Sequence, residues 1–147
     1  MKVANRKARY NYQILETLEA GIVLTGAEVK SVKQGRISLE EAFIKIDPHQ
    51  EAWLVNCHIA GYQFANNQDY KPRRKRKLLL HKKETLYLVK KKQAGKLTII
   101  PVSCYTTRGK IKVKLGLARG KKKWQKKDKK KRRDLDRQAK RALKDYQ

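Results

Sequence analysis

The sequence contains few of the residues that bind metal ions or form disulfides. Its 147 residues include two cysteines and three histidines. Cys57 and Cys104 lie far apart in apolar, strand-like runs, which favours buried reduced thiols over a disulfide framework. His49, His58 and His81 show no metal-ligand spacing with these cysteines. We therefore expect no zinc site, no other metal and no cofactor.

Long hydrophobic runs are also missing. No stretch of about 18 apolar residues is present, and the N-terminal sequence MKVANRKARYNY has no apolar segment of the kind found in signal peptides. These absences predict a cytoplasmic protein with no membrane partner. A basic helix on an anionic membrane would need bulky apolar anchors, and the end of this chain offers mainly Ala, Leu and one Tyr.

Residue sets with catalytic spacing are missing as well. The chain has no Gly-rich phosphate loop, no paired carboxylates at useful spacing and no Cys/His cluster. An enzyme that acts on RNA would need one of these sets. We therefore expect a protein that binds and positions a partner, and not an enzyme.

Positive charge, in contrast, is abundant. The chain has 39 Lys and Arg against 13 Asp and Glu, a net charge of +26. From Arg119 to the C-terminus, fifteen basic residues stand against four aspartates, and the preceding residues still carry about +15. Both parts favour a polyanionic partner, and nucleic acid is the first candidate.

The chain divides into one compact domain, residues 1–120, and a basic tail, residues 121–147. In the tail, apolar residues recur at the spacing of one helix face, at Leu135, Ala139, Ala142, Leu143 and Tyr146. Charge repulsion predicts that the tail is disordered when free and becomes helical when phosphates neutralise it. A merely solubilising tail is the alternative, but it would need no apolar face.

Hydrophobic patterns in the domain predict a mainly β fold with about six short strands and two or three short helices. The expected elements of the first half are a basic N-terminal arm, a strand from Tyr10 with a bend at Gly21, a short helix from Thr25 or Gly26 to Gly35, and a hairpin of 38–46 and 52–59. A loop over 61–77 follows, and then a helix that Leu78–Leu80 enter and that runs to about Gln93, with His81 at the N-cap position and Glu84 three residues later. The last elements are strands 96–105 and 110–117. Such a set closes most economically as a small antiparallel barrel of the OB (oligonucleotide-binding) type. Periodicity alone leaves open another small barrel or an α+β sandwich.

Four blocks of the sequence resemble a known family. They are NRKARYNYQILETLEAGIVLTGAEVKSVKQGR, EAWL, RKLLLHKKE and KVKLGLARGKK, and they occur in the family's order over nearly the whole chain. The chain is similar to the SsrA-binding protein (SmpB) family, the small basic partners of transfer-messenger RNA in bacterial ribosome rescue.

This resemblance implies a function for both parts of the chain. An OB-type barrel with helices would bind the transfer-RNA-like domain of transfer-messenger RNA and deliver it to stalled ribosomes as a monomer. The tail would meet small-subunit RNA in the empty messenger channel, near the decoding centre, and replace the missing codon–anticodon pair. A general RNA-binding or ribosomal protein is the alternative; it explains the charge and the barrel but not the apolar face of the tail.

The resemblance also assigns RNA contacts to Asn5, Glu19 and Leu79. Asn5 can both donate to and accept from a base or sugar, Glu19 can accept from base amino groups, and Leu79 would otherwise be counted as core. Cations supply phosphate contacts, and we expect them at Arg6, Lys7, Arg9, Lys30, Arg73, Arg74, Arg76, Lys77, Arg119, Lys121 and Lys122. The expected contacts with the ribosome and its decoding centre are Lys123, Trp124, Lys126, Lys127, Arg132, Arg133, Leu135, Arg137, Lys140 and Arg141.

The start of the tail departs from the family pattern. Trp124 and Gln125 stand where the family usually has His and Asp. The aromatic position survives, and an indole can stack on a base with about 1–3 kcal/mol. Gln125 leaves an amide where the family's contact uses a carboxylate.

Overall fold

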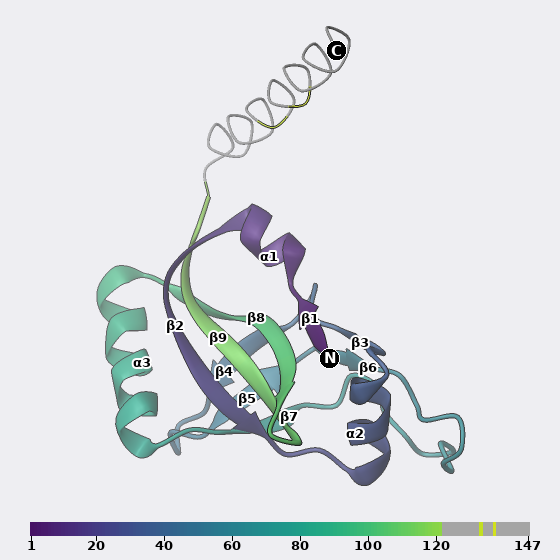
Figure 1. Cartoon of the computed structure of the whole chain (residues 1–147). Helices are drawn as coiled ribbons and strands as arrows, with labels where there is room; N and C mark the ends of the chain where they lie inside the picture. Colours follow the sequence, from purple (N-terminus) through teal and green to yellow (C-terminus); the bar gives the residue numbers. More distant parts are fainter. Residues whose placement is uncertain (122–132, 134–136, 138–147) are drawn as a thin grey trace, which may run out of the picture.

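The computed structural model describes residues 1–121 together with Arg133 and Arg137 (Figure 1). This part of the chain forms nine strands and three helices, a mainly β architecture as the sequence predicts. In order, the elements are β1 (Lys2–Ala4), α1 (Arg6–Asn11), β2 (Tyr12–Ile22), α2 (Gly26–Lys33), β3 (Ile37–Ser38), β4 (Phe43–Ile46), β5 (Ala52–Val55), β6 (His58–Ile59), β7 (Arg76–Leu79), α3 (Lys82–Gly95), β8 (Thr98–Thr107) and β9 (Lys110–Gly120).

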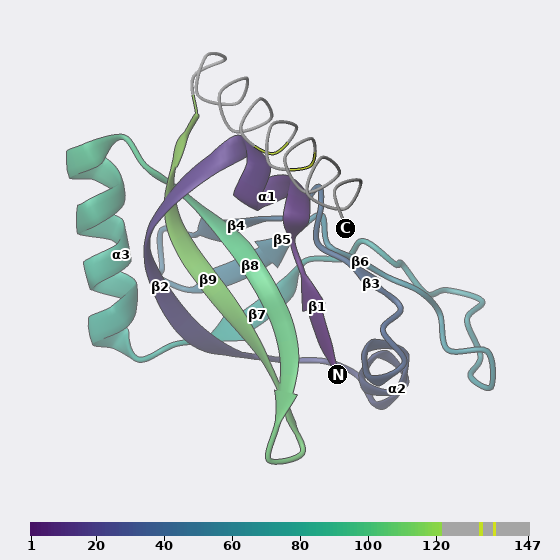
Figure 2. The same cartoon turned by 45° about the horizontal axis from the view of Figure 1, so that its top comes forward.

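Seven of the strands form one antiparallel sheet, in the order β1-β8-β9-β2-β7-β5-β4, and β3 pairs separately with β6. The large sheet curls, so that β4 packs near β8 and the β7-β5-β4 end lies behind β8 and β9 (Figure 2). Its hydrogen bonds do not join β4 to the other edge within the described residues. The closed barrel that we expected is therefore not confirmed, and β1 occupies part of the edge of β8 at which closure would occur.

The inside of this curled sheet is the hydrophobic core. It contains buried side chains from most strands and from α3, among them Leu54, Leu78, Leu88, Val113 and Leu115. The alternation in β9 is as predicted, because Val113 and Leu115 point inward while Lys110 and Lys114 are exposed. The long β2 and β9 pair along most of their length, so they form the central support for whatever lies on the outer face.

Local sequence signals begin and end the helices. Thr25 caps α2 by accepting from the backbone N–H of Glu28 at 3.2 Å, while Glu28 accepts from the N–H of Thr25 at 3.0 Å. Gly35 follows α2 with φ of 76°, a conformation that glycine adopts without strain. At the start of α3, the N–H of His81 donates to Glu84 at 3.0 Å, as the sequence predicts. The two helices lie at opposite ends of the sheet in both views (Figures 1 and 2).

Three local predictions were wrong. The expected N-terminal arm instead forms β1, which pairs with β8, and α1. The run Leu78–Leu80 does not begin a helix, because Leu78 and Leu79 belong to β7 and α3 starts only after His81. The irregularity in β2 lies at Leu15, between two register positions, and not at Gly21.

Candidate nucleic-acid interface

Glu19 and Leu79 line the same open groove, which has a volume of about 840 Å³. The two residues lie on neighbouring strands, since Gly21 of β2 is the register partner of Leu79 on β7. Side chains two residues apart share a face of a strand, so Glu19 and Gly21 point to the same side. The absence of a side chain at Gly21 lets Leu79 lie close, because a Cβ there would be 3.2 Å from the Cβ of Leu79.

Leu79 is an exposed apolar residue in a polar surrounding. Its side chain is 54 % exposed, whereas its neighbour Leu78 is buried. The two face opposite sides of β7, as consecutive strand residues must. Leu79 thus offers an apolar contact to a base or sugar, the role that the resemblance assigns to it.

Glu19 is held by a neighbouring tyrosine. The hydroxyl of Tyr105 on β8 donates to Oε2 of Glu19, across the intervening strand β9. Burial and this hydrogen bond raise the pKa of Tyr105 to about 12, so the phenol remains a donor at neutral pH. The carboxylate is therefore oriented, and Oε1 remains available as an acceptor for an external donor.

Three lysines and two further glutamates, Glu51 and Glu84, lie in the groove beside these two residues. Lys77, Lys82 and Lys112 line the groove with them. Lys77 pairs with Glu51 at 3.3 Å, and both side chains are 43 % exposed, so this ion pair is weak and open to exchange with a phosphate. We had not assigned RNA contacts to Lys82 and Lys112; the alternating lysines of β9 were a signal for the second, but nothing in the sequence places the first beside Glu19.

Asn5 is placed differently from our expectation of a direct RNA contact. Its side chain is 1 % exposed, and its amide donates to the carbonyls of Leu39 at 3.0 Å and Pro101 at 2.9 Å. Its Oδ1 accepts from the N–H of Ala8 at 3.1 Å and so caps α1. An RNA contact through this side chain would break these bonds, and in the structure Asn5 instead positions α1 and the cations on it.

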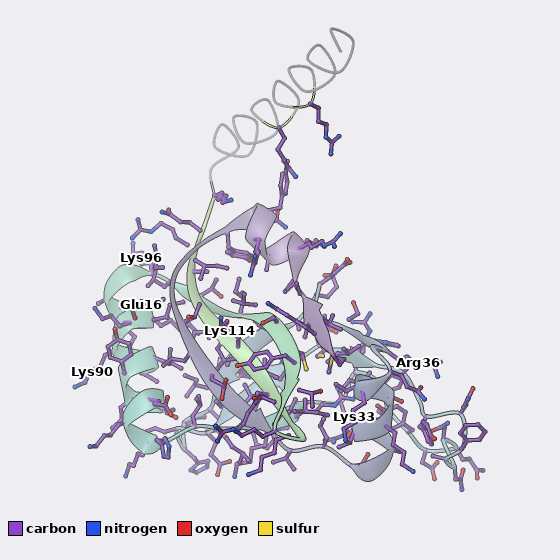
Figure 3. All side chains as sticks on the ribbon, in the orientation of Figure 1. Glu16, Lys33, Arg36, Lys90, Lys96 and Lys114 are labelled. Atoms are coloured by element: carbon purple, nitrogen blue, oxygen red, sulfur yellow. The ribbon has the colours of Figure 1, made fainter. Side chains whose placement is uncertain are left out.

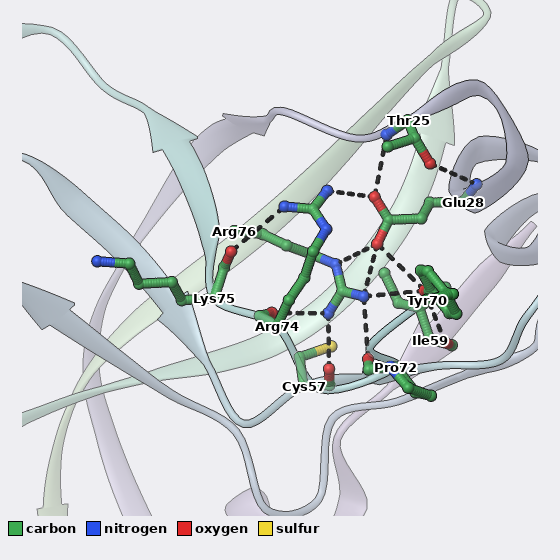
Figure 4. Close-up of polar contacts among 9 residues, drawn as sticks. All are labelled: Thr25, Glu28, Cys57, Ile59, Tyr70, Pro72, Arg74, Lys75 and Arg76. Atoms are coloured by element: carbon green, nitrogen blue, oxygen red, sulfur yellow. Dashed lines mark hydrogen bonds and ion pairs between the residues drawn. The ribbon is translucent and has the colours of Figure 1, made fainter. Parts of the chain in front are cut away.

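Arg76 is also corrected, because it is buried in a polar network (Figure 4). Its Nε donates to Oε2 of Glu28 at 2.7 Å, and its other nitrogens donate to the carbonyls of Cys57 and Pro72 and to Tyr70. Every arm of the guanidinium is thus occupied within the chain. A phosphate contact by Arg76 would have to break these buried bonds, and in the structure its charge balances that of Glu28.

Glu28 is the centre of this network. Burial would raise its pKa, but hydrogen bonds from Arg74, from the backbone of Thr25 and from Arg76 lower the pKa to about 2. Arg74 is partly exposed and also pairs with Glu28, so it is a weaker candidate for a phosphate contact than we expected. The network joins α2 to β7, the strand that carries Leu79.

The other expected cations lie on several surfaces of the described part. On α1, Arg6, Lys7 and Arg9 are exposed, and Lys7 pairs with Glu41 at 2.7 Å. Lys30 lies over the ring of Tyr62, and Arg73 donates to Asn56 at 3.1 Å. Figure 3 shows that basic side chains gather at both ends of the molecule, with Lys90 and Lys96 near α3 and with Lys33 and Arg36 near α2. Arg119 is exposed at the end of β9, and Lys121 donates to the carbonyl of Arg9 at 2.9 Å.

Both cysteines are buried free thiols, as predicted. Burial raises the pKa of Cys57 to about 11 and that of Cys104 to about 12, so neither is a reactive thiolate at neutral pH. Among residues 1–121, Arg133 and Arg137, no group of three or more His, Cys, Asp or Glu side chains could hold a metal ion. No helix in this described part is long and apolar enough to cross a membrane.

One protein-family model matches nearly the whole chain. Residues 2–145 match the model of the family described as "SmpB protein". The chain belongs to the SmpB family. It is 51 % identical over 139 residues to the SsrA-binding protein of Mycolicibacterium smegmatis, covering 95 % of this chain and 86 % of that protein. It is 47 % identical over 142 residues to the SsrA-binding protein of Ligilactobacillus salivarius, covering 97 % and 91 %.

A solved SmpB structure has a similar fold. It comes from work described as "tmRNA-SmpB: a journey to the center of the bacterial ribosome". The two chains superpose with a TM-score of 0.69 and 46 % identity, over 83 % of this chain and 85 % of the other.

Most of the tail contacts expected for an SmpB protein lie outside the described residues. They are Lys122, Lys123, Trp124, Lys126, Lys127, Arg132, Leu135, Lys140 and Arg141. Arg133 and Arg137 are described, and both are exposed on helical backbone. The guanidinium of Arg133 lies 6.0 Å from the ring centroid of Tyr10 at the end of α1.

Proposed function

We propose that this chain is the RNA-binding protein of trans-translation, the ribosome-rescue process that uses transfer-messenger RNA. It binds the transfer-RNA-like domain of that RNA and delivers it to stalled ribosomes. The observation that carries this proposal is the juxtaposition of Glu19 with the exposed Leu79 in one groove that three lysines also line. The names of its relatives, SsrA-binding protein and tmRNA-SmpB, support the same reading.

The groove recognises RNA by three kinds of contact. Leu79 packs against a base or ribose, and Glu19, oriented by Tyr105, accepts from a base amino group or a ribose hydroxyl. Lys77, Lys82 and Lys112 neutralise phosphates and supply most of the affinity. Because these contacts come from β2, β7, β9 and α3, the curled sheet sets their spacing.

The fold that we infer for this sheet is an OB-type barrel. The curvature of the sheet and the packing of β4 near β8 support this inference.

The two parts of the chain have separate tasks in this proposal. Residues 1–120, which end with β9, bind transfer-messenger RNA as a monomer. Residues 121–147 form the tail, which binds in the messenger channel and replaces the codon–anticodon pair. The protein works in the cytoplasm by binding and positioning RNA, without catalysing a reaction.

Competition between two RNAs tests the proposal. We expect tight binding to purified transfer-messenger RNA and much weaker binding to an elongator transfer RNA at the same salt concentration. Leu79→Ala should weaken the first interaction, whereas Leu15→Ala, at a similarly exposed leucine outside the groove, should not. Equal affinity of the wild type for both RNAs would favour a general RNA-binding protein instead.

A further inference from the structure

An aromatic pair, exposed Phe64 and half-buried Tyr62, lies on the loop between β6 and β7. Phe64 is 77 % exposed, the highest value among the large hydrophobic side chains that are exposed in the described residues. Tyr62 packs against it edge to face, with ring centroids 5.4 Å apart and an angle of 69° between the rings. Neither residue lines the groove of Glu19 and Leu79. The loop extends beyond α2, on the side away from α3 in both views (Figures 1 and 2).

Hydrogen bonds fix the turn that presents these rings, residues 61–68, which we call the aromatic turn. The carbonyl of Tyr62 accepts from the side chain of Asn67 at 2.9 Å and from the backbone N–H of Ala65 at 3.0 Å. Asn67 packs so closely on Gly61 that a Cβ there would lie 2.9 Å from its Cγ. A single exposed ring needs no explanation, but this ring is held in position before any partner binds, which lowers the entropic cost of binding.

Tyr70 anchors the base of the same loop to the body. Its hydroxyl donates to the carbonyl of Ile59 at 2.8 Å and lies 3.2 Å from Oε2 of Glu28. It also accepts from Arg76 at 3.1 Å, so the loop is tied to the buried ion-pair network. The aromatic turn is therefore fixed relative to α2.

Cations flank the aromatic turn. The Nζ of Lys30 lies 5.3 Å from the ring centroid of Tyr62. Lys33 and Arg36 lie at the same end of the molecule (Figure 3), and both are exposed. Between Gly61 and Arg73 the sequence has one acidic residue, Asp69. An open aromatic face with cations beside it matches an unpaired base with its flanking phosphates, because bases stack on aromatic rings regardless of sequence.

We propose that the aromatic turn is a second RNA-binding site, where an unpaired base of ribosomal RNA stacks on Phe64 and the flanking phosphates meet Lys30 and Lys33. This inference rests on the proposed function, in which the chain meets two RNAs. Because the aromatic turn lies outside the groove of Glu19 and Leu79, a transfer-RNA-like domain held in that groove leaves the turn available to ribosomal RNA.

Three full-length variants test this site against the wild type. Phe64→Ala removes the ring, Phe64→Trp keeps an aromatic face, and Phe43→Ala is the matched control because Phe43 on β4 is 43 % exposed. Equilibrium binding is measured first with purified transfer-messenger RNA, and then, for the complex with that RNA, with ribosomes whose messenger channel is empty. Thermal unfolding checks that each variant is folded.

We expect Phe64→Ala to weaken ribosome binding about tenfold, in line with the loss of one stacked base, and to leave binding of transfer-messenger RNA unchanged. Phe64→Trp should retain ribosome binding, and ribosomes should quench more indole fluorescence in this variant than in the wild type, which already contains Trp53 and Trp124. Unchanged ribosome affinity of Phe64→Ala would overturn the inference. The inference would also be overturned if Phe64→Ala weakened the binding of transfer-messenger RNA but not the binding of ribosomes. A photo-crosslinking residue at position 64 gives a further test, and a crosslink to a ribosomal protein would again contradict the inference. A wild type that binds no transfer-messenger RNA would instead refute the proposed function.

Discussion

Replacing Glu28 with Gln tests the buried network that joins α2 to β7. The carboxylate is 1 % exposed, and its pKa is about 2 against an ordinary value of 4.5. This difference corresponds to about 3 kcal/mol of stability at neutral pH. A second estimate of the same interaction agrees with this value, because removing one partner of a buried ion pair such as Glu28–Arg76 typically costs about 3–5 kcal/mol. We expect Glu28→Gln to lower the free energy of unfolding by about 3 kcal/mol and the Tm by about 10 °C.

The dependence of folding stability on pH tests the same carboxylate in a second way. Because the pKa of Glu28 is lower in the folded state, its stabilisation is present above about pH 4.5 and is lost as the pH falls toward about 2. The wild type should therefore lose stability over this range more steeply than Glu28→Gln. Urea unfolding at several pH values, followed by circular dichroism, measures both slopes.

Glu41→Gln is the matched control for this experiment. Glu41 pairs with Lys7 at 2.7 Å, but both side chains are about half exposed, so solvent screens the pair and its loss should have little effect. If the two variants unfold alike at pH 7, or if the slopes of wild type and Glu28→Gln coincide, the buried carboxylate does not stabilise the fold in this way.

Three further predictions concern RNA. Glu19→Lys should weaken binding to transfer-messenger RNA by about 1–3 kcal/mol although it adds positive charge, and tighter binding at all salt concentrations in a filter assay would show that Glu19 makes no specific contact. A chain that ends at Gly120 should keep most of its RNA affinity and lose ribosome rescue; loss of RNA binding would contradict separate tasks for domain and tail. Ala139→Pro should block peptide transfer from stalled ribosomes but not RNA binding, because proline costs about 3 kcal/mol or more within a helix. The control is a chain in which residues 128–147 are in scrambled order, which keeps the charge but removes the apolar face. Normal rescue with this tail would show that the segment acts only through its positive charge.

Local sequence determined much of the framework. The predicted start at Thr25 or Gly26 and the predicted stop at Gly35 define α2 correctly, because capping and left-handed stop signals act within one turn of the chain. The alternation of Val113 and Leu115 with the lysines around them likewise identifies β9 and its inner face. The turn after Ile46 predicts the hairpin of β4 and β5, whose register pairs Ile46 with Ala52.

The candidate site depended more on tertiary structure. In the run from Arg76 to Leu80, cations and leucines do not alternate, so the sequence does not say which of them point inward. Pairing of β7 with β2 and β5 turns Arg76 and Leu78 inward and Leu79 outward. A buried arginine is possible there only because Glu28, distant in sequence, supplies the opposite charge.

The burial of Asn5 was likewise decided by tertiary structure and not by the local sequence. Its position before a basic, polar segment predicts an exposed arm, and the signal for a cap on α1 is weak because the helix has only six residues. The carbonyls of Leu39 and Pro101 that bind its amide come from segments that only the folded sheet brings to it. Sequence periodicity thus determined which segments form helices and strands, whereas strand pairing decided which polar groups are buried and which remain free to meet RNA.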